Sequence, residues 1–266
     1  MTQMVARRVP QALPRTCCAP ATLWLGPGRA LYAGPSFELR AHSGSVACLA
    51  VGLDEAFTVD IPGRPARTAR SALIAPRVRH RLVARGRMVF CYLDAASFRG
   101  SSCAGLMTGG DGVLGLHHRH QRRLLRIEPG HDWLDAAAPP GAGRCDPRIG
   151  WAAGVLRSQT HRTVSAGELA DGCGLSVSRF LHLFAACTGT SFRRYRLWAR
   201  MLRVAEFLAD GGDLTTAATG AGFATPSHFS DAFHRMFGLR PSRLLAAGVT
   251  IVRPQEGPPG GSGAAG

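Results

Sequence analysis

Two short stretches of this chain carry polar side chains at the spacing of an exposed helix face. The first stretch begins at Ser176 (SVSRFLHLFAACTGTSF) and the second begins at Thr225 (TPSHFSDAFHRMFGLRP). Hydroxyl, imidazole, guanidinium and carboxylate groups can form hydrogen bonds with base-pair edges in the major groove of DNA, which admits one α-helix. These residues therefore suggest base recognition, and each stretch would need a helix-turn-helix scaffold to present them.

Local signals for such a scaffold surround the first stretch. Ser165 and Glu168 form a capping box, which predicts a helix that begins at the next residue, 166. Gly172 and Gly174 offer the small size and positive φ angle that a tight turn requires. Ser176 then caps a second helix. The spacing of i, i+3, i+4 and i+7 predicts a buried stripe on this helix, made by Val177, Phe180, Leu183, Phe184 and Cys187.

The second stretch repeats the same plan about fifty residues later. Asp213 caps a short helix, and Gly222 lies in the turn that follows it. Thr225 opens the next helix, and Pro226 occupies its first position, where a missing amide costs nothing. Gly238 ends this helix. The expected buried stripe consists of Phe229, Ala232, Phe233 and Met236.

The segment between the two units, FRRYRLWARMLRVAEFL at residues 192–208, has uninterrupted helical periodicity. A helix of this length spans roughly 25 Å and could hold two reading helices about one DNA turn apart. Its arginines, including Arg194 and Arg200, are expected to face mostly outward, where they could contact phosphates. A solvated helix face in an arginine-rich protein is the alternative for each of them.

Either unit alone would also fit a helical hairpin whose polar face meets only water, and it is the repetition that favours DNA binding. The two capped turns, the RLWARMLRVAEFL spacer, the Gly222–Phe223 pair, SHFSDAF and FGLRP together resemble the AraC/XylS class of bacterial transcription regulators. The resemblance covers residues 146–248. It implies two helix-turn-helix units that meet successive major grooves.

Position by position, the resemblance implies which side chains read DNA. The first reading helix would present Ser178, Arg179, Leu181 and His182, and the second would present Pro226, Ser227, His228 and Asp231. Asp231 stands where many members have a basic residue, and Ala217 replaces a larger aliphatic residue, so we expect weaker or less specific binding by the second unit. The full set of expected DNA contacts is Ser176, Ser178, Arg179, Leu181, His182, Arg200, Thr225, Pro226, Ser227, His228, Asp231 and Arg235.

Residues 36–98 change to a period of two and to short apolar runs, such as SVACLAVGL, EAFTVDI, RSALIAP and MVFCYLD. Gly, Pro and Asp separate these runs, as in an antiparallel sandwich or barrel. The cadence resembles the cupin-like jelly roll that many AraC-class regulators carry as a sensor. The expected fold class is therefore α+β, with a β sensor domain followed by an all-α domain. The partners that follow are double-stranded DNA, an unknown small-molecule effector, RNA polymerase and a second copy of the chain.

Catalytic or metal chemistry is not expected. A metal-binding cupin needs His and carboxylate ligands that converge inside the barrel, whereas His42 and His80 stand alone. We expect the cluster of His117, His118 and His120 on a solvated basic helix near residues 117–126, with no metal and no cofactor. Two alternatives stay open: a small-molecule-binding or catalytic cupin with a helical appendage, and an architectural protein that binds DNA without sequence choice.

The net charge of +15 favours a nucleic-acid partner, but its distribution does not locate the contact. Residues 1–145 hold 19 arginines against 9 acidic residues, residues 146–266 hold 13 against 8, and lysine is absent. No apolar run approaches the roughly 20 residues that span a bilayer, so we expect a cytoplasmic protein. The expected organisation is a flexible segment at 1–35, a sensor and dimerisation domain at 36–135, a linker at 136–147, a DNA-binding domain at 148–250 and a disordered tail at 251–266.

Overall fold

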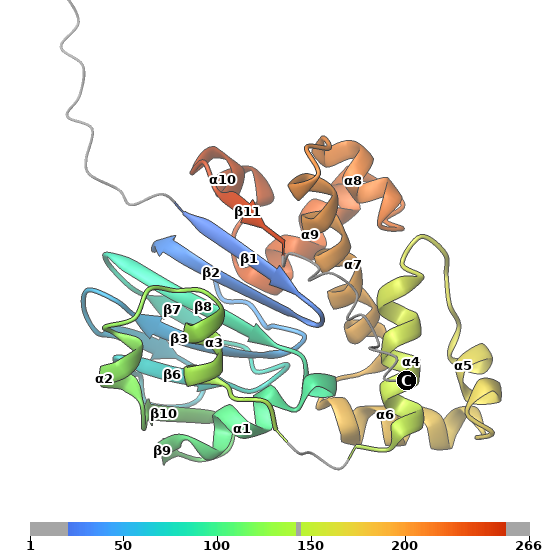
Figure 1. The fold of residues 1–266 in the computed structure, drawn as a ribbon, viewed down its shortest axis with the longest axis horizontal. Helices are drawn as coiled ribbons and strands as arrows, with labels where there is room; N and C mark the ends of the chain where they lie inside the picture. The colour runs from blue at the N-terminus through green and yellow to red at the C-terminus, as the bar shows by residue number, and fades with distance from the viewer. Residues whose placement is uncertain (1–20, 142–144, 254–266) are drawn as a thin grey trace, which may run out of the picture.

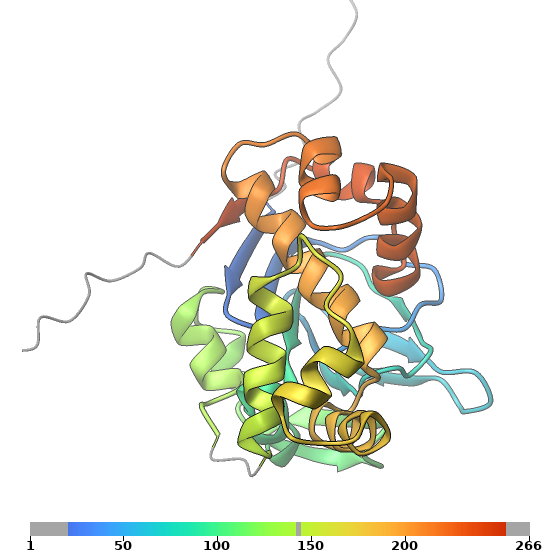
Figure 2. The same ribbon diagram turned by 90° about the vertical axis from the view of Figure 1, so that its right-hand side faces the viewer.

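The computed structural model describes residues 21–141 and 145–253 and shows a β-rich part followed by a helical part (Figure 1). The strands and three short helices of residues 22–138 form the β domain. The helices of residues 147–246 form the helical domain, which packs against one end of the β domain (Figure 2). The expected α+β fold class, with the β domain first, is confirmed.

The β domain contains a large sheet and a small sheet. The large sheet has the strand order β11-β1-β2-β8-β3-β6-β10-β9, and the small sheet has the order β5-β4-β7. Neighbouring strands are antiparallel, except that β1 and β11 are parallel. The strands are β1 (Thr22–Gly26), β2 (Arg29–Pro35), β3 (Ala47–Gly52), β4 (Phe57–Asp60), β5 (Arg67–Ala69), β6 (Ser71–Ile74), β7 (Arg81–Val83), β8 (Arg87–Leu93), β9 (Met107–Gly110), β10 (Leu114–His118) and β11 (Thr250–Val252).

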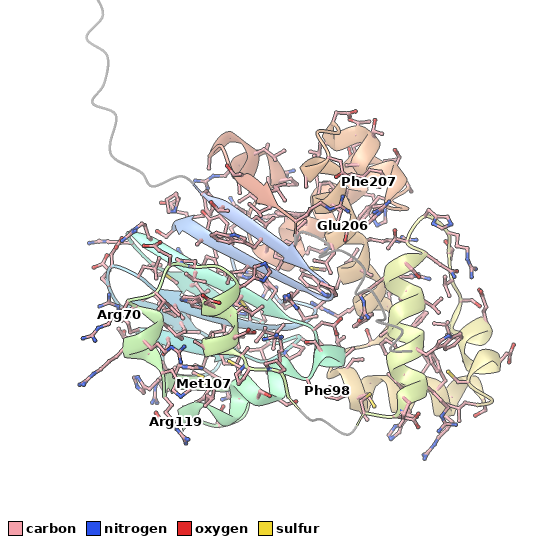
Figure 3. All side chains as sticks on the ribbon, in the orientation of Figure 1. Arg70, Phe98, Met107, Arg119, Glu206 and Phe207 are labelled. Atoms are coloured by element: carbon pink, nitrogen blue, oxygen red, sulfur yellow. The ribbon has the colours of Figure 1, made fainter. Side chains whose placement is uncertain are left out.

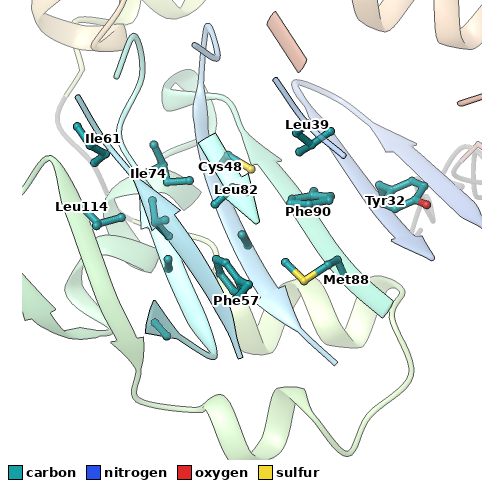
Figure 4. Close-up of a cluster of buried hydrophobic side chains, with 14 of the residues drawn as sticks. Tyr32, Leu39, Cys48, Phe57, Ile61, Ile74, Leu82, Met88, Phe90 and Leu114 are labelled. Atoms are coloured by element: carbon teal, nitrogen blue, oxygen red, sulfur yellow. The ribbon is translucent and has the colours of Figure 1, made fainter. Parts of the chain in front are cut away.

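The central strands of the large sheet are buried on both faces. Tyr32 and Phe90 belong to a core that includes Phe57 of the small sheet (Figure 4). Their chain neighbours Leu31 and Cys91 belong to a second core on the opposite face. Successive side chains in a strand point to opposite faces, so burial of both faces produces continuous apolar runs instead of a clean alternation. This explains why runs such as MVFCYLD indicated strands.

Short helices cover the second core. They are α1 (Arg99–Gly105), α2 (Gln121–Leu124) and α3 (His131–Ala137), preceded by a 3-10 turn η1 (Ala95–Ser97). Trp133 of α3 is fully buried, and its indole N–H donates a hydrogen bond of 3.0 Å to the carbonyl of Leu124. Residues 136–138 are buried at the end of α3, so the linker begins later than residue 136. Within the expected linker, residues 142–144 lie outside the described residues.

The prediction of a helix near residues 117–126 is wrong. Strand β10 extends to His118, because Leu114 and Leu116 pair with β6 and fill the first core, and only Gln121–Leu124 is helical. His117 is exposed, whereas the rings of His118 and His120 lie 5.7 Å apart. His118 is buried, its Nε2 donates to the carbonyl of Ala137 at 2.9 Å, and its Nδ1 accepts from the backbone N–H of His120 at 3.1 Å. Over residues 21–141 and 145–253, no group of three or more His, Cys, Asp or Glu side chains could hold a metal ion.

The helices of the two units follow the local signals closely. The side chain of Ser165 accepts a hydrogen bond from the backbone N–H of Glu168 at 3.1 Å, as the capping box predicts. Helix α4 was not predicted as a separate element. The helices are α4 (Pro147–Ser158), α5 (Ala166–Gly172), α6 (Val177–Thr188), α7 (Phe192–Ala209), α8 (Leu214–Gly220), α9 (Pro226–Phe237) and α10 (Pro241–Ala246).

The helical domain completes the hydrophobic core at the β1–β2 end of the large sheet. Leu25 and Ala30 of these strands share one cluster with Trp198 and Met201 of α7 and with Phe229 of α9. After α10 the chain returns to the sheet, where β11 pairs with the edge strand β1. The two domains therefore share a continuous core instead of meeting through a loose linker alone.

Two expectations about the chain ends are corrected by this arrangement. Strands β1 and β2 lie at residues 22–35, which were expected to be flexible, and β11 lies at the start of the expected disordered tail. These strands are stabilised by pairing across the domain boundary, which local sequence does not reveal. Residues 1–20 and 254–266 lie outside the described residues.

A buried histidine pair joins the loop after β2 to the loop before β7. His42 and His80 exchange two backbone hydrogen bonds of 2.9 Å, and their ring centroids are 4.3 Å apart. Each Nδ1 lies within 2.9 Å of a carbonyl oxygen, on Arg40 and Val78 respectively. Burial, and then the neighbouring His80, lower the pKa of His42 to about 4, with smaller effects from Arg79 and His234. The pair is therefore neutral at pH 7.

We expect His42 alone to lower the free energy of unfolding by about 2 kcal/mol between pH 7.5 and pH 5. Its folded pKa of about 4 lies below the ordinary value of 6.5, so the unfolded state takes up more protons as the pH falls. The stability is fully present above pH 6.5 and is lost toward pH 4. Urea unfolding of the wild type and of His42→Gln at both pH values measures the difference. Equal pH dependence of the two proteins would contradict this account.

Candidate nucleic-acid interface

Helix α6 presents the first candidate reading face. Phe180 and Phe184 anchor its opposite side, since both are fully buried in a core with Tyr195 of α7. Val177 was expected in this buried stripe but is 45% exposed, because the first residue of the helix extends past the core. The exposed side includes every residue expected to contact DNA from this helix and its cap, namely Ser176, Ser178, Arg179, Leu181 and His182.

The cap and turn of this unit fix the start of the reading helix. The hydroxyl of Ser176 accepts a hydrogen bond of 3.3 Å from the backbone N–H of Arg179. Gly174 has a φ of +64°, in the left-handed region that favours glycine. The turn therefore sets the direction in which α6 leaves α5, and the exposed side chains begin directly after the cap.

Helix α9 presents the second candidate reading face. The hydroxyl of Thr225 accepts from the backbone N–H of His228 at 3.0 Å, and Phe229 and Met236 are buried on the inner side. The ring of His228 stands edge-on to that of Phe223, with centroids 5.6 Å apart. Each expected contact residue of this helix and its cap is exposed: Thr225, Pro226, Ser227, His228, Asp231 and Arg235.

The arginines of α7 are less available for contacts with DNA phosphates than their sequence pattern indicated. Arg194 donates to the backbone carbonyl of Ser43 at 2.5 Å and to its hydroxyl at 2.9 Å, so this side chain binds the β domain. Arg203 pairs with Glu206 at 2.9 Å, and its guanidinium carbon lies 4.5 Å from the ring centroid of Phe207. Glu206 and Phe207 are labelled in Figure 3. The expectation that these arginines face mostly outward is therefore wrong for Arg194, which is satisfied within the protein.

Arg200 lies partly buried against the turn of the second unit. A Cβ added at Gly222 would lie 2.4 Å from the carbonyl oxygen of Thr160 and 3.2 Å from both Nε and Nη2 of Arg200. Its Nε is buried and has no hydrogen-bond partner among the described residues, and burial lowers its pKa. Gly222 itself has a φ of +83°, so the turn needs glycine both for its conformation and for the close approach of the Thr160 carbonyl. Arg200 therefore supports the turn from behind.

A buried carboxylate joins the β domain to the first unit, and sequence reasoning did not single it out. Asp94, at the end of β8, is fully buried. Its Oδ2 accepts from the hydroxyl of Tyr195 on α7 and from Arg157 Nη1 on α4 at 3.1 Å, while Oδ1 accepts from the backbone N–H of Ala96 at 2.9 Å. Burial raises the pKa of Asp94, and its hydrogen bonds oppose that rise. These bonds hold α4 and α7 on the sheet.

An apolar cavity of about 90 Å³ lies where the two domains share their core. The sheet contributes Tyr32, Phe90 and Tyr92, and α7 contributes Trp198. Helix α9 contributes Phe233 from the side opposite to its exposed face. The cavity thus touches the back of a candidate reading helix.

Comparisons with known proteins agree with this geometry. The family model described as a helix-turn-helix domain matches residues 169–247, which contain α6, α9 and both turns. An apo variant of ToxT from Vibrio cholerae strain SCE256 gives a TM-score of 0.58 at 11% sequence identity, over 84% of this chain and 98% of that chain. Another ToxT structure from Vibrio cholerae gives 0.54 at 10% identity, over 83% and 99%. Wild-type ToxT from strain SCE256 with a bound unsaturated fatty acid gives 0.50 at 13% identity, over 82% and 94%.

The family match falls on the same residues that carry the AraC/XylS motifs, and the solved structures share the fold of both domains. The chain is a DNA-binding transcription regulator with a helix-turn-helix domain. No curated protein sequence matches it significantly. In the described part of this regulator, no helix is both long enough and apolar enough to cross a membrane.

We expect Asp94→Ala to lower the free energy of unfolding of this regulator by about 3 kcal/mol, because it leaves the buried Tyr195 hydroxyl and Arg157 without their acceptor. Asp210→Ala is the matched control, since Asp210 pairs with Arg253 while both side chains are about half exposed. Its loss should cost at most about 1 kcal/mol. Urea unfolding of the three proteins gives the comparison. Equal losses in the two variants would show that Asp94 does not hold the domains together.

Proposed function

We propose that α6 and α9 read two adjacent major-groove segments of one DNA site. The observation that carries this proposal is the pair of exposed polar faces, each beginning at a capped helix start and each backed by buried aromatic residues. Helix α7 links the two units and has 18 residues, or roughly 27 Å at 1.5 Å per residue. Reading elements one DNA turn apart are separated by 34–36 Å. The length of α7 together with the reading helices at its two ends is comparable to this separation.

Each reading face offers distinct base contacts. Arg179 can donate two hydrogen bonds to guanine O6 and N7, and His182, one turn away, can add a further donor or acceptor. On α9, His228 can contact a base edge while Asp231 accepts from cytosine N4. Val177 and Leu181 are exposed beside these polar groups and are suited to the methyl group of thymine.

Phosphate contacts would set the position of the protein on DNA. The capped starts of α6 and α9 present backbone N–H groups beside the hydroxyls of Ser176 and Thr225, and helix N-termini favour phosphate. Arg235 is exposed near the end of α9 and adds a positive charge. In this proposal Arg200 supports the turn at Gly222 and does not contact DNA itself, so its effect on DNA affinity is indirect.

The same proposal includes a small-molecule effector in the apolar cavity between the domains. A structure of ToxT holds an unsaturated fatty acid, and the similar fold makes effector binding a reasonable assignment here. The cavity is lined by both the sheet and the inner side of α9, so an occupant would contact a reading helix directly. RNA polymerase and a second copy of the chain stay predictions from the family resemblance.

Selection of sequences from a random duplex library by the purified protein tests the reading assignment. Arg179→Ala should lose base preference at one element of the selected site and His228→Ala at the other, by about 1–3 kcal/mol of discrimination each. Arg243→Ala is the control for lost charge, because Arg243 is exposed on α10, outside both reading faces. It should change affinity equally for all sequences.

Two outcomes would overturn this proposal. If both reading-face variants kept the wild-type base preference, the assigned faces would be wrong. If the wild type bound scrambled duplexes as tightly as selected ones across a range of salt concentrations, the protein would be an architectural DNA binder.

A further inference from the structure

Both candidate reading faces continue to the C-terminal end of their helix, where a glycine follows. Gly189 ends α6 seven residues after His182, and Gly238 ends α9 seven residues after Asp231. Because seven residues make about two turns of helix, each glycine lies on the same side of its helix as the reading residue before it. A group that contacts either glycine therefore lies at the edge of a reading face.

Two loops of the β domain contact these glycines. A Cβ added at Gly189 would lie 3.5 Å from Cγ of Pro76, in the loop between β6 and β7. A Cβ added at Gly238 would lie 2.6 Å from the carbonyl oxygen of Arg40, in the loop between β2 and β3. The backbone N–H of Arg40 also donates to the carbonyl of Gly238 at 2.9 Å. The β domain therefore reaches the ends of both reading faces.

Backbone hydrogen bonds join residues 40–44 and 76–80 of these loops into one element, which we call the basic loop pair. His42 and His80 exchange two backbone bonds of 2.9 Å. Arg194 of α7 holds the element from the helical side, since it donates to a backbone carbonyl of the first loop at 2.5 Å. The basic loop pair is thus held in position by both domains.

The positive charge of the basic loop pair has no acidic partner in the described chain. Its two segments, RAHSG and PRVRH, contain no acidic residue. Arg40, Arg77 and Arg79 are exposed, and none of them forms an ion pair with a described residue. Arg235 of α9 is exposed as well, and its carbonyl accepts from the N–H of Ser43 at 3.3 Å. Such a cluster of like charges favours a polyanionic partner.

Arg77 occupies a backbone conformation that suits glycine better. Its φ is +68°, in the left-handed region where a Cβ crowds the following carbonyl oxygen. Its N–H donates to the carbonyl of Gly44 at 2.9 Å, so this conformation belongs to the join between the two loops. A glycine would satisfy the same turn. The fold alone therefore does not call for an arginine here.

We propose that the basic loop pair binds DNA phosphates at the inner edges of the two major-groove segments, where the backbone passes between the reading helices. This inference rests on the proposed reading of adjacent segments by α6 and α9, since a minor groove bordered by two phosphate strands separates such segments. Arg77 and Arg79 lie in the element that contacts the ends of both helices. The β domain thereby adds affinity that does not depend on base sequence.

Fluorescence anisotropy of the full chain with a selected and a scrambled duplex, over a range of salt concentrations, tests this inference. Arg77→Gly combined with Arg79→Gln should weaken binding to both duplexes by at least about tenfold at 0.1 M salt. The slope of log affinity against log salt should become less steep by about 2, because each phosphate contact contributes about 0.9. The ratio of the two affinities should stay the same.

Two controls separate the proposed contact from loss of fold or of net charge. Arg77→Gly alone should leave the free energy of unfolding equal or higher, because glycine adopts a positive φ without strain. Arg122→Gln combined with Arg123→Gln removes two exposed arginines from α2, on the side of the β domain away from α4–α6 (Figure 1). This pair should leave the salt slope almost unchanged. Arg79→Gln, which leaves the backbone unaltered, should reduce the slope by about 1 on its own.

Uncharged methylphosphonate links locate the contact on the duplex. Placed at the inner edges of the two reading segments, they should weaken binding of the wild type and have no further effect on the Arg77→Gly, Arg79→Gln variant. An unchanged salt slope or a higher affinity in that variant would overturn the inference, as would a loss confined to the selected duplex or an equal loss in the α2 control.

Failure of this inference is distinct from failure of the reading assignment. A wild type that bound selected and scrambled duplexes equally would contradict base reading by α6 and α9. A salt slope reduced by the double variant would in that case still assign phosphate contacts to the basic loop pair. Retained base preference with an unchanged slope would do the reverse.

Discussion

Burial of one apolar sheet face is the constraint on which the arrangement of this regulator depends. At the β1–β2 end of the large sheet, Leu25 and Ala30 are buried by α7 and α9. These helices pack Trp198, Met201 and Phe229 into the same core. Burying such side chains is worth about 25 cal/mol per Å² of apolar surface, without directional preference. Direction comes from polar contacts at the edge of the same interface, where Asp94 binds Tyr195 and Arg157 and where Arg194 binds the loop at Ser43.

This shared core gives the proposed regulation a physical route. Helix α9 has its exposed side available for DNA while its inner side touches the cavity and the sheet, so a change in packing on one side acts on the same rigid element as base contacts on the other. Coupling of this kind requires that the ligand and DNA each favour one arrangement of the two domains, and the effect is reciprocal. The first unit differs, because its attachment to the β domain is the polar contact at Asp94.

Apart from α4, the helices of the helical domain were predictable to within a residue or two because their signals are local. Ser176, Asp213 and Thr225 cap the helices that follow them, and Gly174 and Gly238 adopt the left-handed conformation that ends a helix or makes a turn. Exposure of the expected reading residues also followed from periodicity. Val177 was expected on the buried side of α6 but is exposed, since a periodic pattern does not show where a core ends.

Features set by tertiary contacts were not predictable. Strands β1, β2 and β11 depend on each other and on α7, and no short stretch of sequence reveals that pairing. The end of β10 was mistaken for helix because the basic stretch after it hides the pairing of Leu114 and Leu116 with β6. Asp94 looked like an ordinary acidic residue after a strand, and its role appears only when α4 and α7 approach it. The same holds for the cavity, whose lining comes from distant parts of the chain.

Hydroxyl-radical footprinting of the full chain on its selected duplex tests the central claim most directly, because it reports where both units meet DNA at the same time. The account predicts two protected segments on one face of the duplex, with centres about 10 base pairs apart. A single short protected segment would contradict simultaneous reading by α6 and α9, and protection spread evenly along the duplex would contradict sequence-specific recognition.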